Sequence, residues 1–86
     1  MPRICEFLGI VIYMYFSDHA PSHFHAIYGQ YEAEVSIDKS MIIRGSLPPR
    51  AAELVQEWAK IYKMELEDNW ERARNHEPLK SIPALE

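Results

Sequence analysis

Three of the four histidines of this 86-residue chain lie within seven positions, and an aspartate directly precedes the first of them. The stretch reads Asp18-His19-Ala20-Pro21-Ser22-His23-Phe24-His25. Imidazole nitrogens and carboxylate oxygens are common ligands of zinc, and imidazole also suits iron, copper and nickel. The cluster therefore suggests a site for a divalent metal such as zinc, with Asp18, His19, His23 and His25 as candidate ligands.

The spacing of the last two histidines favours a shared site. Side chains two positions apart on a strand point to the same face, so His23 and His25 would present their rings together. His19 precedes that strand and can fold back toward them. Glu34, directly across from His25, or Glu32 on the diagonal, would supply a carboxylate, and an open metal position would activate water. The candidate catalytic set is therefore His19, His23 and His25, with Glu32 as the preferred carboxylate.

Other interpretations of the same residues stay open. The histidine pair can lie on a solvated sheet face beside glutamates, or perform acid–base chemistry without a metal. Asp18 suits an Asx turn, in which His19 would cap the loop. His76 is expected on the surface. No established enzyme motif is recognisable, so the sequence does not decide whether the chain is an enzyme.

The first half of the chain predicts an antiparallel sheet. Apolar and β-branched residues indicate strands at Ile4–Leu8, Ile10–Phe16, His23–Tyr28, residues 31–37 and Met41–Arg44. Gly29-Gln30 is typical of a two-residue hairpin turn, which would pair residues whose numbers sum to 59. In that register Phe24, Ala26, Tyr28 and their partners face the core, and the histidines face the other side.

The second half predicts one long helix from Pro49 to about Asn75. Its apolar residues recur at three- and four-residue steps. At 1.5 Å per residue such a helix is roughly 40 Å long, whereas a chain of this size is about 30 Å across, so the helix either breaks or projects. A projecting end would expose an apolar stripe, which predicts partner binding or self-association through Leu66, Trp70 and Ala73.

Composition predicts one soluble domain over residues 1–86. The chain is 48% hydrophobic and 26% charged, and its longest apolar run, residues 7–16, is too short to span a membrane. Cys5 is the only cysteine and no export signal is recognisable, so we expect a cytoplasmic location. A net charge of -4 disfavours nucleic acid as the main partner. The expected fold class is α+β, with four to five short strands packed on one long C-terminal helix.

The chain also resembles a family of small prokaryotic proteins, domain of unknown function 4160. The resemblance rests on Gly9-Ile10, the motif Asp-His-x-Pro-x-His-Phe-His-Ala at residues 18–26, Leu47-Pro48, Glu57-Trp58 and Asn69-Trp70. It covers nearly the whole chain and implies no established activity.

The family's gene neighbourhoods imply a function as one member of a toxin–antitoxin-like pair, which binds a small protein encoded nearby. Tyr13 stands where members of this kind carry a basic residue, and Glu34 lies outside the motif. The expected function is therefore binding of a small partner protein, with the histidine cluster as the functional site. The alternative is a metal-dependent hydrolase, for example a nuclease, that uses the same cluster.

Overall fold

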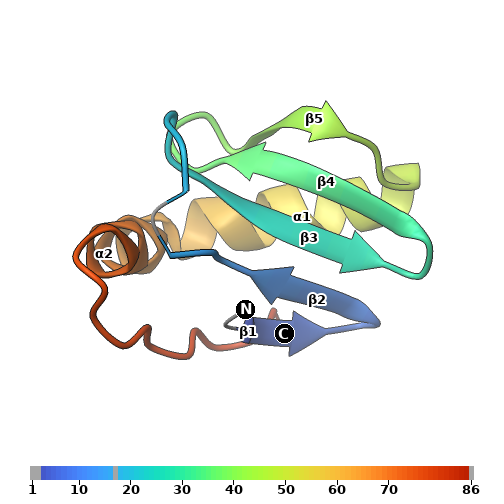
Figure 1. Cartoon of the computed structure of the whole chain (residues 1–86). Coiled ribbons are helices and arrows are strands. Elements are labelled where there is room, and N and C mark those ends of the chain that lie inside the picture. Colours follow the sequence, from blue (N-terminus) through green and yellow to red (C-terminus); the bar gives the residue numbers. More distant parts are fainter. Residues whose placement is uncertain (1–2, 17, 86) are drawn as a thin grey trace.

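A computed structural model describes residues 3–16 and 18–85 of the chain. The described residues form a five-stranded antiparallel sheet and two helices (Figure 1). The strands are β1 (Arg3–Phe7), β2 (Ile10–Tyr13), β3 (His23–Tyr28), β4 (Tyr31–Ser36) and β5 (Met41–Gly45), and they lie side by side in chain order. The predicted α+β class and the five strands are confirmed. Strand β2 ends at Tyr13 rather than Phe16, because the chain leaves the sheet there to form the loop that carries Asp18.

Two tight turns set the register of the sheet. Strands β3 and β4 pair as predicted, with Tyr28 opposite Tyr31 and His25 opposite Glu34. Gly29 has a φ angle of +60°, the conformation that this turn requires. The turn between β1 and β2 has positive φ angles at both Leu8 and Gly9, which is the pattern of a type I′ hairpin.

Gly45 and Gly29 provide a matched test of backbone strain. Both have positive φ angles, but a Cβ at Gly45 would overlap the backbone carbonyl oxygen of Glu32, whereas a Cβ at Gly29 would meet no atom within 4 Å. We expect Gly29→Ala to lower the free energy of unfolding by about 1 kcal/mol. Gly45→Ala should lower it by about 3 kcal/mol, because steric overlap adds to the conformational cost. Urea denaturation measures both, and equal losses would contradict this difference.

The single long helix predicted from the sequence is wrong. The chain forms α1 (Pro49–Ile61) and α2 (Lys63–Arg74), separated at Tyr62, which has non-helical backbone angles of φ -108° and ψ 29°. The molecule measures 33 × 25 × 22 Å, so an unbroken helix of roughly 40 Å would have projected beyond it. In Figure 1, α1 crosses behind the sheet, and α2 packs at one end of it. Neither helix has the length and apolar character needed to cross a membrane.

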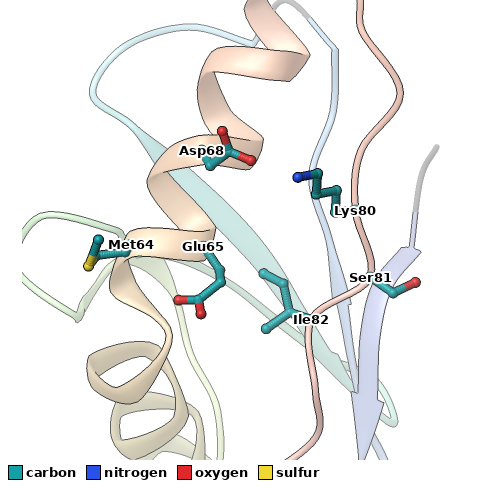
Figure 2. Close-up of a pocket in the computed structure, with 6 residues that line it drawn as sticks. All are labelled: Met64, Glu65, Asp68, Lys80, Ser81 and Ile82. Atoms are coloured by element: carbon teal, nitrogen blue, oxygen red, sulfur yellow. The ribbon is translucent and has the colours of Figure 1, made fainter.

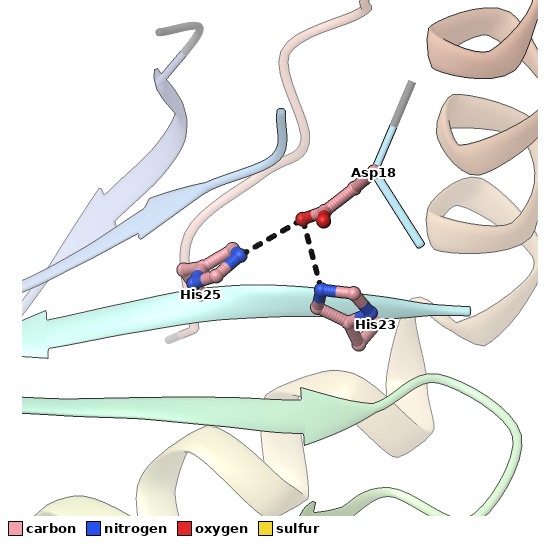
Figure 3. Close-up of side chains that lie close together, drawn as sticks. All are labelled: Asp18, His23 and His25. Atoms are coloured by element: carbon pink, nitrogen blue, oxygen red, sulfur yellow. Dashed lines mark hydrogen bonds and ion pairs between the residues drawn. The ribbon is translucent and has the colours of Figure 1, made fainter. Parts of the chain in front are cut away.

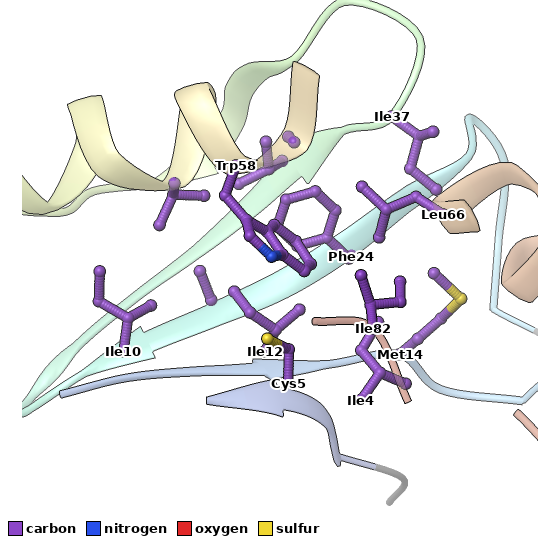
Figure 4. Close-up of a cluster of buried hydrophobic side chains, with 14 of the residues drawn as sticks. Ile4, Cys5, Ile10, Ile12, Met14, Phe24, Ile37, Trp58, Leu66 and Ile82 are labelled. Atoms are coloured by element: carbon purple, nitrogen blue, oxygen red, sulfur yellow. The ribbon is translucent and has the colours of Figure 1, made fainter. Parts of the chain in front are cut away.

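The core lies between the sheet and the helices (Figure 4). Its fully buried side chains include Ile10, Ile12, Met14, Phe24, Val35, Ile37, Val55, Trp58 and Leu66. Tyr28 and Tyr31 were also predicted to face the core, but they are 38% and 49% exposed. Both flank the β3–β4 turn, at the far end of the sheet from α2 (Figure 1).

The C-terminal segment closes the core along β1. The Ile82 amide donates to the Ile4 carbonyl at 2.9 Å, and the Trp58 indole donates to the Pro83 carbonyl at 2.8 Å. Cys5 is buried beside the same carbonyl, with Sγ 3.6 Å away, and burial raises the pKa of its thiol. Cys5 is therefore a buried structural thiol.

Candidate functional site

The predicted histidine cluster forms at the junction of one loop and one strand. His23 and His25 begin β3 and project from the face opposite Phe24. Asp18 lies in the loop between β2 and β3, directly above these two rings. Figure 3 shows both rings pointing from β3 toward the carboxylate of Asp18.

One carboxylate oxygen contacts both rings. Asp18 Oδ2 lies 2.9 Å from Nε2 of His23 and 3.2 Å from Nε2 of His25. The side chains of the two histidines are 0% and 10% exposed, and that of Asp18 is 16% exposed. The three donor atoms therefore meet at one point that is almost closed to solvent.

Backbone contacts determine which nitrogen of His23 faces Asp18. Nδ1 of His23 lies 2.7 Å from the carbonyl oxygen of Pro21. A carbonyl only accepts hydrogen bonds, so Nδ1 carries the hydrogen, and in a neutral ring Nε2 has a lone pair. That lone pair faces an acceptor, the ionised Asp18 carboxylate. The contact therefore requires a second proton on the ring or a metal cation between the two groups.

His25 has an unsatisfied polar atom. Its Nδ1 is buried and has no hydrogen-bond partner among the described residues. The nearest carboxylate oxygen, Oε2 of Glu32, is 3.6 Å away, slightly beyond hydrogen-bond distance. Histidine ligands of metals usually donate their second N–H to a carboxylate or carbonyl, so Glu32 is placed to orient His25.

The environment keeps Asp18 ionised at neutral pH. Burial acts to raise the pKa of this carboxyl, but the hydrogen bond from His25 and the one from the His19 backbone amide act against it. The electrostatic interaction with His23 and its hydrogen bond act in the same direction, and together these contacts hold the pKa below its usual value. An ionised carboxylate is the form that binds metals.

Two aromatic rings fix the buried imidazoles. Tyr15 packs edge-on against His25 with ring centroids 4.3 Å apart, and Trp70 packs against His23 at 5.3 Å. Burial chiefly raises the pKa of the Tyr15 hydroxyl, and the charges of Glu32 and Asp18 add to the effect. Tyr15 therefore stays protonated beside the cluster.

The contact with Trp70 corrects a prediction from the sequence. The stripe on α2 was expected to be exposed, but Leu66, Trp70 and Ala73 are 0%, 7% and 1% exposed. Because the chain breaks at Tyr62, α2 turns these residues into the core. The geometric reason for expecting an interface there does not hold, and Trp70 instead supports the histidine cluster.

Two further predicted residues lie at the outer side of the cluster. Nε2 of His19 is 3.7 Å from Oδ1 of Asp18, and Oε1 of Glu34 is 3.7 Å from Nε2 of His23. Arg44 approaches the other oxygen of Glu34 at 3.9 Å. The structure therefore brings together the histidines and carboxylates proposed from the sequence, and Glu34, directly across from His25 as predicted, lies 3.7 Å from Nε2 of His23.

The sequence reasoning missed the two aromatic residues at the site. Tyr15 was assigned to a strand, although its place two residues beyond Tyr13 puts it on the histidine face, a signal that could have identified it. Trp70 comes from a distant helix, and no local pattern in the sequence places it beside His23.

A separate cavity lies away from the cluster. It has a volume of about 300 Å³ between α2 and the C-terminal segment, and Figure 2 shows its lining residues, Met64, Glu65, Asp68, Lys80, Ser81 and Ile82. None of the predicted site residues lines it. A smaller hollow of about 220 Å³ in front of β4 and β5 includes Glu32, Glu34 and Arg44, and it borders the histidine cluster.

The donor distances match metal coordination. Ligand atoms about 2.0–2.1 Å from a tetrahedral zinc ion lie roughly 3.3 Å from one another. The contacts of 2.9 and 3.2 Å at Asp18 are close to that separation. Two groups have ligand atoms that all lie within 4.8 Å of one another: Asp18 with His23 and His25, and His19 with His23 and Glu34.

Together, the fold and the site define a small α+β protein with a buried carboxylate–histidine cluster on the open face of its sheet. The chain belongs to the family described as domain of unknown function (DUF4160), whose family model matches residues 9–71. This range includes the whole cluster. No curated protein and no solved structure matches the chain.

Proposed function

We propose that the chain is a metal-dependent hydrolase that holds one divalent transition-metal ion between Asp18, His23 and His25. The observation that carries this proposal is the meeting of Nε2 of His23 and Nε2 of His25 at one oxygen of Asp18. Two imidazoles and one carboxylate suit zinc, iron, copper and nickel, and three protein ligands leave a position open for water. An ion of this kind activates water for attack on a polar bond.

A metal accounts for the cluster better than a shared proton. A proton on Nε2 of His23 would satisfy the contact of this nitrogen with Asp18 but would leave Nδ1 of His25 without a partner. With a metal on Nε2 of His25, Nδ1 carries a hydrogen that Glu32 can accept after a small movement. The same cation would accept a lone pair from Nε2 of His23 and from Nε2 of His25, and it would balance the charge of the Asp18 carboxylate.

The two glutamates have different roles in this proposal. Glu32 orients His25 from outside the ion's ligands. Oε1 of Glu34 is 3.7 Å from Nε2 of His23, so Glu34 would lie near a bound ion and would serve as the general base that takes a proton from the attacking water. Arg44 lies 3.9 Å from the second oxygen of Glu34 and helps to position this carboxylate.

Activity with and without metal tests the proposal. The protein would be stripped with a chelator, reloaded with Zn²⁺, and assayed on an activated phosphodiester such as bis(p-nitrophenyl) phosphate. We expect activity that is lost on stripping and restored by Zn²⁺. Glu34→Gln should lower kcat by about 100-fold with Zn²⁺ still bound. Glu57→Gln, on the exposed side of α1, is the control and should change nothing. Equal rates for stripped and loaded protein would contradict the proposal.

We also propose that the chain acts in the cytoplasm as one member of a two-gene module and binds the small protein encoded beside it. The family resemblance motivates this proposal, and the free edge of the sheet supports it. At that edge, β5 exposes Met41 at 56% and Ile43 at 44%. The opposite edge is covered, because Ile82 bonds to Ile4. Co-purification with the neighbouring gene product, lost in Ile43→Lys but retained in Ile61→Lys, would support docking at β5.

A further inference from the structure

His19 differs from the two buried histidines in its exposure. Its side chain is 61% exposed, whereas those of His23 and His25 are 0% and 10% exposed. Trp70 and Tyr15 clamp the buried rings. The ring of His19 packs against a neighbouring imidazole in this cluster, that of His23, at a centroid distance of 5.1 Å. His19 therefore stands at the mouth of the cluster and can move with little loss of packing.

The orientation of the His19 ring is that of a metal ligand. Nδ1 lies 3.2 Å from the carbonyl oxygen of Ala20, and because a carbonyl only accepts, Nδ1 is the donor. The lone pair is then on Nε2, which lies 3.7 Å from Oδ1 of Asp18. His23 is held in the same way by the carbonyl of Pro21. Two successive loop carbonyls thus direct two Nε2 atoms toward the same place.

The second donor group shows where a His19 ligand would bind. His19, Glu34 and His23 have ligand atoms within 4.8 Å of one another. His23 belongs to both donor groups, and its Nδ1 is committed to Pro21, so only its Nε2 is free for a metal. Because one nitrogen binds a single ion at a time, the two groups cannot hold separate ions through it. An ion between Asp18, His23 and His25 would therefore have His19 and Glu34 as the further donor groups near Nε2 of His23.

We propose that His19 is an exchangeable ligand of this ion. Nε2 of His19 occupies the coordination position that the reacting water would otherwise occupy. The inference rests on the proposed metal site. In the resting protein His19 fills the remaining coordination position of the ion, and an incoming substrate or anion displaces His19. Glu34 then lies beside the vacated position, where a general base is needed. His19 is therefore the residue that controls access to the metal.

Azide binding to the cobalt-loaded protein tests this role. Co²⁺ replaces zinc in such sites, and its visible spectrum reports changes in its ligands. We expect wild type, His19→Ala and His76→Ala each to bind one Co²⁺ and to melt at similar temperatures. If His19 occupies the position about nine-tenths of the time, its removal raises the azide affinity about 10-fold. His76→Ala removes a histidine that belongs to neither donor group, so its azide affinity should equal that of wild type.

Three results would overturn the proposal. Equal azide affinities of wild type and His19→Ala would show that His19 does not occupy the position. Loss of Co²⁺ binding in His19→Ala, to the level of a His23→Gln variant, would make His19 a permanent ligand. Failure of wild type to bind Co²⁺ in a His23-dependent manner would refute the metal site itself, and the exchangeable ligand with it. The last result differs from the first two, because only in it does the wild-type protein lack the proposed metal site.

Discussion

Replacing His23 with glutamine should lower the affinity of the protein for Zn²⁺ by at least about 100-fold, since loss of even a residue outside the metal's ligands costs 10- to 100-fold. Nε2 of His23 is common to both donor groups, and its ring is fixed by the Pro21 carbonyl and by Trp70. Glutamine has a similar volume but lacks an imidazole nitrogen. Competition with a chromophoric chelator measures the change.

A second variant separates loss of a ligand from loss of the fold. Asp18→Asn retains the shape of a side chain that lies in a loop, and it removes the charge that binds the ion. It should also weaken Zn²⁺ binding by at least about 100-fold, whereas His76→Gln should have no effect. If Asp18→Asn and His23→Gln both stay folded and bind Zn²⁺ as tightly as wild type, the assignment of these ligands is wrong.

Trp58→Ala should cause the largest loss of stability, about 3–5 kcal/mol in the free energy of unfolding. Trp58 is fully buried, and its ring lies 5.5 Å from that of Phe7 and 5.6 Å from that of Phe24. Its indole N–H also holds the C-terminal segment through Pro83. Alanine therefore leaves a cavity and releases the segment that closes the core.

Trp58→Phe is the matched control for this prediction. Phenylalanine retains most of the packing but cannot donate a hydrogen bond to Pro83, so we expect a smaller loss of about 1–3 kcal/mol. Guanidinium denaturation followed by circular dichroism measures both variants. Losses of equal size would show that the hydrogen bond, rather than the packing of the ring, accounts for the effect of Trp58.

The sheet was predictable because short stretches of sequence determine its turns and the faces of its strands. A turn at Gly29-Gln30 fixes the β3–β4 register, and that register places His25 opposite Glu34. Alternation along β3 then places His23 on the same face as His25. The predicted convergence of these histidines required only these two rules.

The helices and the aromatic walls of the site were less predictable because they depend on tertiary packing. The apolar stripe continues through Tyr62, so no residue there marks a break, and only the dimensions of the molecule indicated that the helix must bend or project. The bend brings Trp70 against His23. The C-terminal segment was not assigned at all, because its contacts, such as that of Ile82 with Ile4, join the two ends of the chain.

The position of Asp18 shows how local pattern and loop geometry combine. The sequence placed it in a turn and offered two roles, an Asx turn or a metal ligand. In the structure Oδ1 accepts from the His19 amide at 2.9 Å, one residue on rather than two as in an Asx turn, while Oδ2 faces His23 and His25. The loop contact thus positions the carboxylate for the buried histidines.

Anomalous diffraction tests the proposed binding of one divalent metal ion between Asp18, His23 and His25. Crystals grown with Zn²⁺ would be measured on both sides of the zinc absorption edge. We expect one strong anomalous peak about 2.0–2.1 Å from Nε2 of His23, Nε2 of His25 and a carboxylate oxygen of Asp18. Zinc bound only at other surface residues, with Asp18 still hydrogen-bonded directly to both rings, would contradict it.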